Sequence, residues 1–280
     1  MSYRVLNSIS VKNLNGKEFV KDKSSLLVVL VDKSAKKNKL LINMDKVTKG
    51  SLFKSINSFM KSKAKSLNLQ SPDGVSSKEV LLMKTPEKSN TFLWLDLFKS
   101  ISKIANSLGK QDISVMFACK YPDGKDESWL TEVCCRQIEA SAYIFGSSKN
   151  KTIVKPSLKR ASIIASSVTA SALKKLKNSA KVGFAVGEAM NAAKHLGDMP
   201  ANLCTPRIIE RKVKALKKPF PKLKISTFNE KDLAKLKMGS FLSVGRGSDE
   251  PSRMMTIEHK GGKAGEKPIV LVGKGITFDT

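Results

Sequence analysis

Leu26-Leu27-Val28-Val29-Leu30-Val31 is a run of six apolar residues that ends at Asp32 and a cluster of lysines. A short apolar run that contains β-branched residues and no polar interruption is typical of a strand covered on both faces. A second run covers residues 80–83 and is closed by Pro86, and residues 113–118 return the chain as a third strand. These segments predict the inner strands of one sheet.

Helical spacing separates the predicted strands. One helix is predicted from four apolar residues three or four positions apart, with Asn90 as N-cap and Gly109 as the stop signal: Leu93, Leu97, Ile101 and Ile104. Residues 127–145 predict a second helix, and residues 53–60 a third, whose continuation to Leu69 is either helix or loop. Strands that alternate with helices predict an α/β fold with a largely parallel sheet.

A domain boundary is predicted where the sequence SSKNKTIVKPSLK, residues 147–159, loses periodicity and gains charge. We therefore expect an N-terminal α/β domain over residues 1–150. Residues 151–165 would form a linker that leads, through a strand beginning at Arg160, into a second domain over residues 166–280. With 280 residues, the chain is long enough for two domains of ordinary size.

The second domain is also predicted to be α/β. A long helix over residues 170–196 is rich in small residues in its later half, which allows a neighbouring element to approach closely. Thr205 is placed to cap a helix that begins at Pro206. Asn229 is placed to cap a short helix that has Asp232 in its first turn. Strands are predicted over residues 222–227, 254–259 and 269–272.

Composition restricts where the protein acts. The start of the chain lacks signal-peptide character, and no segment approaches the roughly 18 continuous apolar residues that a membrane span requires. The four cysteines show neither a CxxC pair nor the spacing of a disulfide framework, which suits a reducing compartment: Cys119, Cys134, Cys135 and Cys204. We therefore expect a cytoplasmic protein that does not bind membranes.

The formal net charge of +27 attracts polyanions such as nucleic acid. Residues 1–160 hold 29 basic and 14 acidic residues, and residues 161–280 hold 22 and 10, so the excess is spread along the chain. Lysine accounts for 44 of the 51 basic residues, whereas reading of base edges favours arginine. A solvated lysine coat is the favoured interpretation, and weak binding to phosphate backbones remains the alternative.

The segment after residues 269–272 lies where ligands gather in an open α/β sheet, beyond the carboxyl end of a strand. A phosphate-binding loop is excluded, because that motif needs glycine where Pro268 stands and Ser or Thr where Gly275 stands. The turn Gly245-Arg246-Gly247 lacks the third glycine of a dinucleotide-binding fingerprint. Neither glycine turn therefore predicts a nucleotide site.

Three ordered motifs resemble the leucine aminopeptidase (cytosol aminopeptidase) family. Val272-Gly273-Lys274-Gly275-Ile276-Thr277-Phe278-Asp279 resembles its metal-binding signature. The stretch Asp198 to Pro206 resembles its Pro-Ala-Asn turn, and Met238 to Ser248 resembles its Met-Gly…Gly-x-Gly-Ser segment. The resemblance covers residues 130–280 well, and residues 1–130 mainly through the α/β pattern.

The resemblance implies a macro-like N-terminal domain followed by the first part of a two-metal aminopeptidase domain. In the family, the residue matching Lys274 ligates one divalent ion and the residue matching Asp279 bridges two. Zn²⁺ or Mn²⁺ is the implied cofactor, N-terminal residues of peptides such as leucine are the implied substrates, and a hexamer is the implied assembly. A glycine turn with two solvated charges is the alternative for Lys274 and Asp279.

The family's remaining ligands have no match in this sequence, so we expect an incomplete catalytic domain that is inactive alone. A non-catalytic DNA-binding or regulatory protein and a decayed fragment are the alternatives. Other residues have simpler interpretations: His195 and His259 as surface residues at element ends, and Cys134-Cys135 as packing within a helix.

Overall fold

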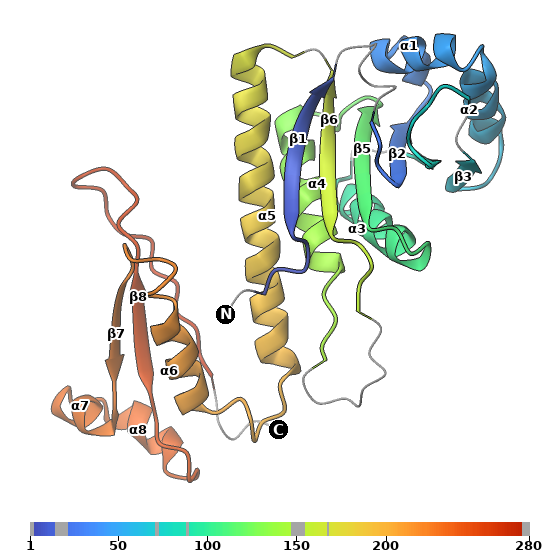
Figure 1. The fold of residues 1–280 in the computed structure, drawn as a ribbon. Coiled ribbons are helices and arrows are strands. Elements are labelled where there is room, and N and C mark those ends of the chain that lie inside the picture. Colours follow the sequence, from blue (N-terminus) through green and yellow to red (C-terminus); the bar gives the residue numbers. More distant parts are fainter. Residues whose placement is uncertain are drawn as a thin grey trace. The chain divides into compact units, whose positions relative to one another are not determined.

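The computed structural model describes residues 3–14, 22–70, 73–87, 90–146, 155–166 and 168–275. The chain forms two compact units, Ser2–Lys194 and His195–Thr280 (Figure 1). Each unit combines helices with a sheet.

A six-stranded sheet forms the centre of the first unit. Its strands follow the order β1-β6-β5-β2-β4-β3, and every pairing is parallel except that of β3 with β4. The bounds are Ser8–Leu14 (β1), Leu26–Val31 (β2), Ser66–Gln70 (β3), Glu79–Lys84 (β4), Asp112–Ala118 (β5) and Arg160–Ser166 (β6). Every residue of β2 is buried, as expected for a strand covered on both faces. The predicted α/β fold with a largely parallel sheet is confirmed.

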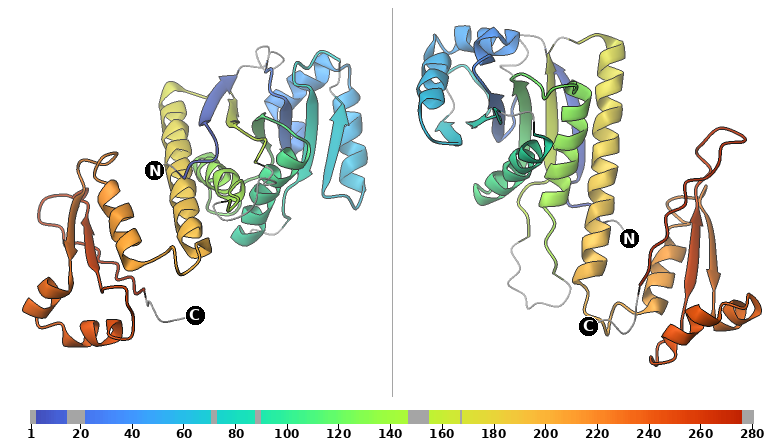
Figure 2. Two further views of the ribbon diagram at one scale, coloured as in Figure 1. Left: turned by 60° about the horizontal axis from the view of Figure 1, so that its bottom comes forward. Right: turned by 180° about the vertical axis from the view of Figure 1, so that it is seen from behind.

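Helices cover both faces of this sheet (Figures 1 and 2). Their bounds are Lys39–Val47 (α1), Ser51–Lys61 (α2), Thr91–Ser107 (α3), Glu127–Ser141 (α4) and Ala170–Asp198 (α5), with a short 3-10 turn at Ala35–Lys37. Buried side chains of α1 and α2 pack with one set of strand residues, and those of α3, α4 and α5 pack with the alternate set. The two hydrophobic clusters follow from the two-residue period of the strands.

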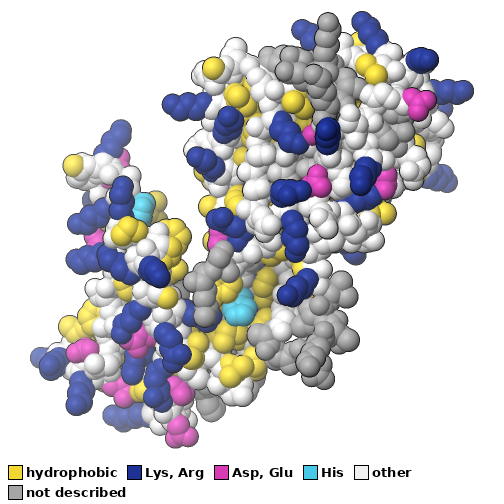
Figure 3. All heavy atoms as spheres, in the orientation of Figure 1, with side chains coloured by type: hydrophobic (Ala, Val, Ile, Leu, Met, Phe, Trp, Pro, Cys, Tyr) yellow, Lys and Arg dark blue, Asp and Glu magenta, His cyan; other side chains and the backbone are white. Residues whose placement is uncertain are grey.

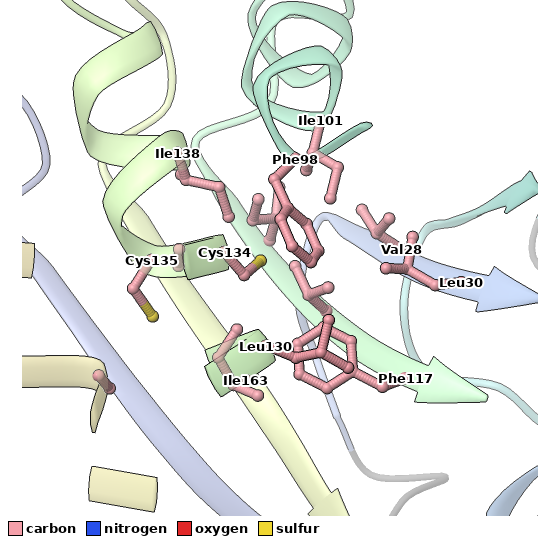
Figure 4. Close-up of a cluster of buried hydrophobic side chains, with 14 of the residues drawn as sticks. Val28, Leu30, Phe98, Ile101, Phe117, Leu130, Cys134, Cys135, Ile138 and Ile163 are labelled. Atoms are coloured by element: carbon pink, nitrogen blue, oxygen red, sulfur yellow. The ribbon is translucent and has the colours of Figure 1, made fainter. Parts of the chain in front are cut away.

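Phe98 of α3 lies near the centre of the larger cluster (Figure 4). Its ring centroid is 5.9 Å from that of Trp94 and 6.2 Å from that of Phe117. Cys134 and Cys135 of α4 are buried in the same cluster as free thiols, and burial raises the pKa of both. A raised pKa keeps a thiol protonated and unreactive, so the predicted packing role of this cysteine pair is confirmed.

The predicted helix ends are also confirmed for α3. The Asn90 side chain accepts a hydrogen bond from the backbone N–H of Phe92. Gly109 follows the helix with a φ of +65°, a conformation that glycine adopts without steric cost. α4 begins at the predicted residue but ends at Ser141, before the expected end at residue 145.

Two glycines allow α5 to pack closely against α4. A Cβ atom on Gly183 would overlap the carbonyl oxygen of Glu132, and one on Gly187 would lie 2.8 Å from the Cβ atom of Glu139. The predicted close approach through small residues is thus confirmed. No helix in the described ranges is long and apolar enough to cross a membrane.

The two units divide later in the chain than the sequence suggested. Arg160–Ser166, expected to lead into a second domain, is instead β6 of the first sheet and pairs with both β1 and β5. Since α5 packs on α4 of the same unit, the division falls between Lys194 and His195, not near residue 150. Residues 151–154, the start of the expected linker, lie outside the described residues.

The second unit contains a two-stranded antiparallel sheet. Its elements are Pro206–Ala215 (α6), Lys224–Phe228 (β7), Glu230–Lys235 (α7), Gly239–Gly245 (α8) and Met254–Glu258 (β8). Thr205 caps α6 by accepting a hydrogen bond from the backbone N–H of Ile208. Asn229 and Asp232 form a reciprocal capping box on α7, so both predicted caps are confirmed.

Candidate metal-binding segment

The predicted strand at Ile269–Val272 is wrong for the structure of this chain. The segment has no regular secondary structure, and its side chains are 72–93% exposed. A strand needs backbone partners on a neighbouring strand. The only strands that the structure describes in this unit, β7 and β8, pair with each other and not with Ile269–Val272.

Lys274 follows this segment and is exposed. The flanking Gly273 and Gly275 lie in open space, with no atom of another residue within 4 Å of where a Cβ would stand. Asp279, the second predicted ligand, lies outside the described residues. The structure therefore places Lys274 on an exposed, irregular segment.

The described residues alone do not fit a two-metal centre. Over the described ranges there is no group of three or more His, Cys, Asp or Glu side chains that could hold a metal ion. One lysine amine offers a single ligand, whereas a two-metal site needs several carboxylates or other donors around both ions. Further ligands would have to come from elsewhere.

The turn between α5 and α6 has a defined backbone structure. The carbonyl oxygen of Pro200 accepts hydrogen bonds from the N–H groups of Leu203, at 2.8 Å, and Cys204, at 2.9 Å. These hydrogen bonds close a turn within the stretch that resembles the family's Pro-Ala-Asn turn. Asn202, the last residue of the Pro-Ala-Asn motif, is exposed.

The Met238–Ser248 segment contains α8, and the backbone of Gly245 lies close to the side chain of Ser252. A Cβ atom on Gly245 would overlap the hydroxyl oxygen of Ser252, so glycine allows these two segments to meet. Ser252 is buried, and its N–H donates to a carboxylate oxygen of Glu230 at 2.9 Å. Ser252 thereby contacts both the Gly-x-Gly turn and Glu230 at the start of α7.

Two ion pairs that the sequence did not suggest join α6 to the segment between α8 and β8. Glu210 of α6 accepts from the Arg253 guanidinium at 2.8 Å, and Arg207 lies 3.0 Å from the carboxylate of Glu250. Hydrogen bonding from Lys214 lowers the pKa of Glu210, and Arg253 adds to this effect. Partners so far apart in sequence have no spacing signal, so only the fold could reveal them.

The two histidines lie where the sequence placed them. His195 is in the last turn of α5, where partial burial and the nearby Lys212 ammonium lower its pKa. His259 follows β8 and is exposed. Neither belongs to a potential metal-binding cluster within the described part of the chain.

Residues 191–280 match the catalytic domain of the cytosol aminopeptidase family. A probable cytosol aminopeptidase from Aromatoleum aromaticum is 38% identical over 67% of this chain and 37% of the relative. Another from Nitrosomonas europaea is 34% identical over 76% of this chain and 43% of the relative. The match to the family's catalytic domain includes Lys274.

Solved structures share the fold. A tomato leucine aminopeptidase mutant superposes with a TM-score of 0.65 at 20% identity, over 89% of this chain and 50% of that one. The bottromycin maturation enzyme BotP, solved in complex with Mn, superposes with a TM-score of 0.61 at 16% identity, over 84% and 45%. These likenesses place the chain among the α/β aminopeptidase folds.

This chain belongs to the cytosol aminopeptidase family. It spans 37% and 43% of the two relatives described above. The predicted family is therefore confirmed.

Proposed function

We propose that this chain provides the N-terminal unit and the first part of the catalytic domain of a metal-dependent aminopeptidase that releases N-terminal residues, such as leucine, from peptides. The match of residues 191–280 to the family's catalytic domain is the observation that supports this function. Lys274 would ligate one divalent ion, Zn²⁺ or Mn²⁺, and Asp279 would bridge two.

We also infer that the chain alone is inactive, and the exposure of Lys274 supports this inference. Coordination requires the free amine, which a cluster of ligands around a bound dication would stabilise. Because the described residues do not assemble such a cluster, ligands must be added before Lys274 can bind metal.

Titration calorimetry with Mn²⁺, together with hydrolysis of leucine p-nitroanilide, tests this function. The chain alone should show neither saturable binding of two ions nor hydrolysis. Hydrolysis by the purified chain that depends on Mn²⁺ would show that it holds a complete site. The family's hexamer and a cytoplasmic location are further expectations, which size-exclusion chromatography with light scattering and cell fractionation would test.

Binding of nucleic acid is the second candidate function, and one face of α5 favours it. Lys174, Lys177 and Lys181 recur three and four residues apart and are all exposed. Residues 170–187 contain no Asp or Glu. Figure 3 shows Lys and Arg side chains spread over the visible face of both units rather than gathered in one place, which favours weak, sequence-independent binding.

Retention of DNA over a range of salt concentrations tests the second candidate. Binding through phosphates should fall steeply as salt rises, and Lys174→Gln/Lys177→Gln/Lys181→Gln should flatten this dependence. Absence of retention even at low salt would exclude it.

A further inference from the structure

A hollow of about 650 Å³ lies beside the first turns of α5. Its size is within the range of about 300–1,000 Å³ that takes a small ligand. The polar side chains that line it are those of Ser171, Asn178 and four lysines, Lys174, Lys175, Lys177 and Lys181. All four lysines are exposed. Pockets for small ligands are mostly lined by apolar and aromatic side chains, so a lining of ammonium groups indicates an anionic ligand.

The positive charge of this hollow is largely without acidic partners. Lys175 pairs with Asp126 at 2.8 Å, whereas Lys174, Lys177 and Lys181 form no ion pair with the residues that the structure describes. The helix contains no acidic residue within this stretch. Lysines three and four residues apart on a helix are neighbours and repel each other. Bound anions would relieve this repulsion.

Lys174, Lys177 and Lys181 form a row along the helix. The first and the last are seven residues apart, which is about 10 Å along the axis at a rise of 1.5 Å per residue. A row of this length offers contacts to several phosphates in succession, whereas a single phosphate would leave one end of the row without a partner. The lysine ammonium is a compact point charge, so it does not require the fixed planar geometry of an arginine contact. The row therefore suits a chain of phosphates.

The hollow offers no means of recognising bases. Among the described residues, neither an aromatic side chain nor an arginine lines it. Bases therefore have no ring to stack on and no bidentate donor at their edges. Because duplex DNA is stiff over a length of about 150 base pairs, it enters a hollow beside one helix less readily than a flexible chain does.

We propose that the hollow beside α5 binds a flexible chain of three or more phosphates and prefers such a chain to duplex DNA. Inorganic polyphosphate and the backbone of single-stranded nucleic acid share this chemistry. The net charge of +27 attracts any polyanion, so the preference for a flexible chain is what distinguishes the hollow from the rest of the surface. The inference deepens the second candidate function, on which it rests, by naming the ligand.

Fluorescence anisotropy at an ionic strength of about 0.1 M tests this preference. The probes are a labelled oligothymidylate of about 12 nucleotides, a labelled duplex of the same length, and unlabelled inorganic polyphosphate of about 12 phosphates as competitor. We expect the single strand to bind at least about 10-fold more tightly than the duplex, because the stiff duplex brings fewer phosphates to the lysines. Polyphosphate should displace the single strand.

Lys174→Gln/Lys177→Gln/Lys181→Gln is the decisive variant. Because all three side chains are exposed, the substitutions should leave thermal unfolding unchanged. They should weaken binding of the single strand at least about 10-fold. The slope of the logarithm of the binding constant against the logarithm of the salt concentration should become shallower by about 2, as expected for three phosphate contacts on a single strand.

The matched control is Lys54→Gln/Lys61→Gln/Lys63→Gln. It removes the same charge from three exposed lysines in α2 and just after it. Since these lysines do not line the hollow, the control should change the affinity for the single strand less than about 3-fold.

Three outcomes would overturn the inference: no binding of either flexible chain, a duplex bound as tightly as the single strand, or equal weakening by the two triple variants. Binding of the duplex that depends on the lysines of the hollow would support the second candidate function and contradict the inference. Binding of polyphosphate without binding of nucleic acid would support the inference and contradict that candidate function.

Discussion

The carboxylate of Glu139, buried in α4, accepts a hydrogen bond from the backbone N–H of Leu6 at 3.0 Å. It also accepts one from the N–H of Val5 at 2.7 Å and one from the side-chain amide of Asn191 in α5 at 3.2 Å. A single side chain thus joins the segment before β1 to two helices. Nearby, the Arg4 guanidinium pairs with Glu188 and lies 4.7 Å from the centroid of the Phe184 ring.

Replacing Glu139 with alanine should destabilise the first unit by about 2–4 kcal/mol. The N–H groups of Val5 and Leu6 would lose their acceptor, and a buried donor without a partner costs about 1–3 kcal/mol. Urea unfolding followed by circular dichroism measures the change. A loss below about 0.5 kcal/mol, the size of an ordinary surface substitution, would show that these hydrogen bonds contribute little.

The Glu139→Gln variant tests the ionisation of this group. Burial raises the pKa of Glu139 above its ordinary value of 4.5, despite the opposing hydrogen bonds from Val5 and Leu6. The folded state therefore binds the proton more tightly than the unfolded state does. The stability associated with this proton is present below pH 4.5 and is lost as pH rises through the folded pKa. Wild type should therefore lose stability relative to Glu139→Gln as pH rises from 4.5. A constant difference between the two proteins would contradict the raised pKa.

The Lys12–Asp22 ion pair should respond to pH in the opposite sense. Burial of Asp22 opposes its ionisation, but hydrogen bonds from Lys12, at 2.6 Å, and from Ser24 outweigh burial and hold the pKa of Asp22 below 3.8. This contribution to stability is present above pH 3.8 and is lost as pH falls through the folded pKa. Since Lys12 is partly exposed, Lys12→Met should cost about 1–2 kcal/mol at neutral pH. The cost should shrink in acid, and an equal cost at both pH values would exclude an electrostatic origin.

Gly183→Ala should destabilise the contact of α5 with α4. The added methyl group would overlap the backbone oxygen of Glu132, which cannot move without a shift of the helix. Overpacking of this kind costs about 1–3 kcal/mol, which a fall in the thermal midpoint would show. Gly197→Ala is the control, because nothing lies within 4 Å of the new atom. A loss of stability as large in the control would remove the packing explanation.

Local signals predicted much of the fold because their causes lie within a few residues. The caps at Asn90, Thr205 and Asn229 follow from side chains that bond to backbone groups two or three residues away. The buried strand β2 follows from six apolar residues in a row. Such features depend little on the rest of the chain.

Other elements were missed where polar residues hide the pattern. No helix was predicted at α1, although Leu40, Leu41 and Met44 are buried and Asn38 caps the helix. β1 alternates apolar and polar residues in a strand that lies at the edge of the sheet. The lysines on the exposed face of α1 and the serines along β1 weaken a prediction that is based on apolar runs.

The position of β6 could not be predicted from the sequence, because a pairing across more than 100 residues leaves no local trace. Its neighbours β1 and β5 determine that residues 160–166 belong to the first unit. The candidate site shows the same limit. Lys274 was predicted by resemblance to a motif, and among the described residues no group of three or more His, Cys, Asp or Glu side chains could hold a metal ion.

The central claim is that Lys274 is a metal ligand of an aminopeptidase site for which the described residues supply no cluster of further ligands. Its most direct test is titration calorimetry of the chain with Mn²⁺, carried out beside hydrolysis of leucine p-nitroanilide. We expect neither saturable binding of two ions nor hydrolysis, because a two-metal site needs several donors around both ions. Saturable binding of two ions together with Mn²⁺-dependent hydrolysis would contradict the claim.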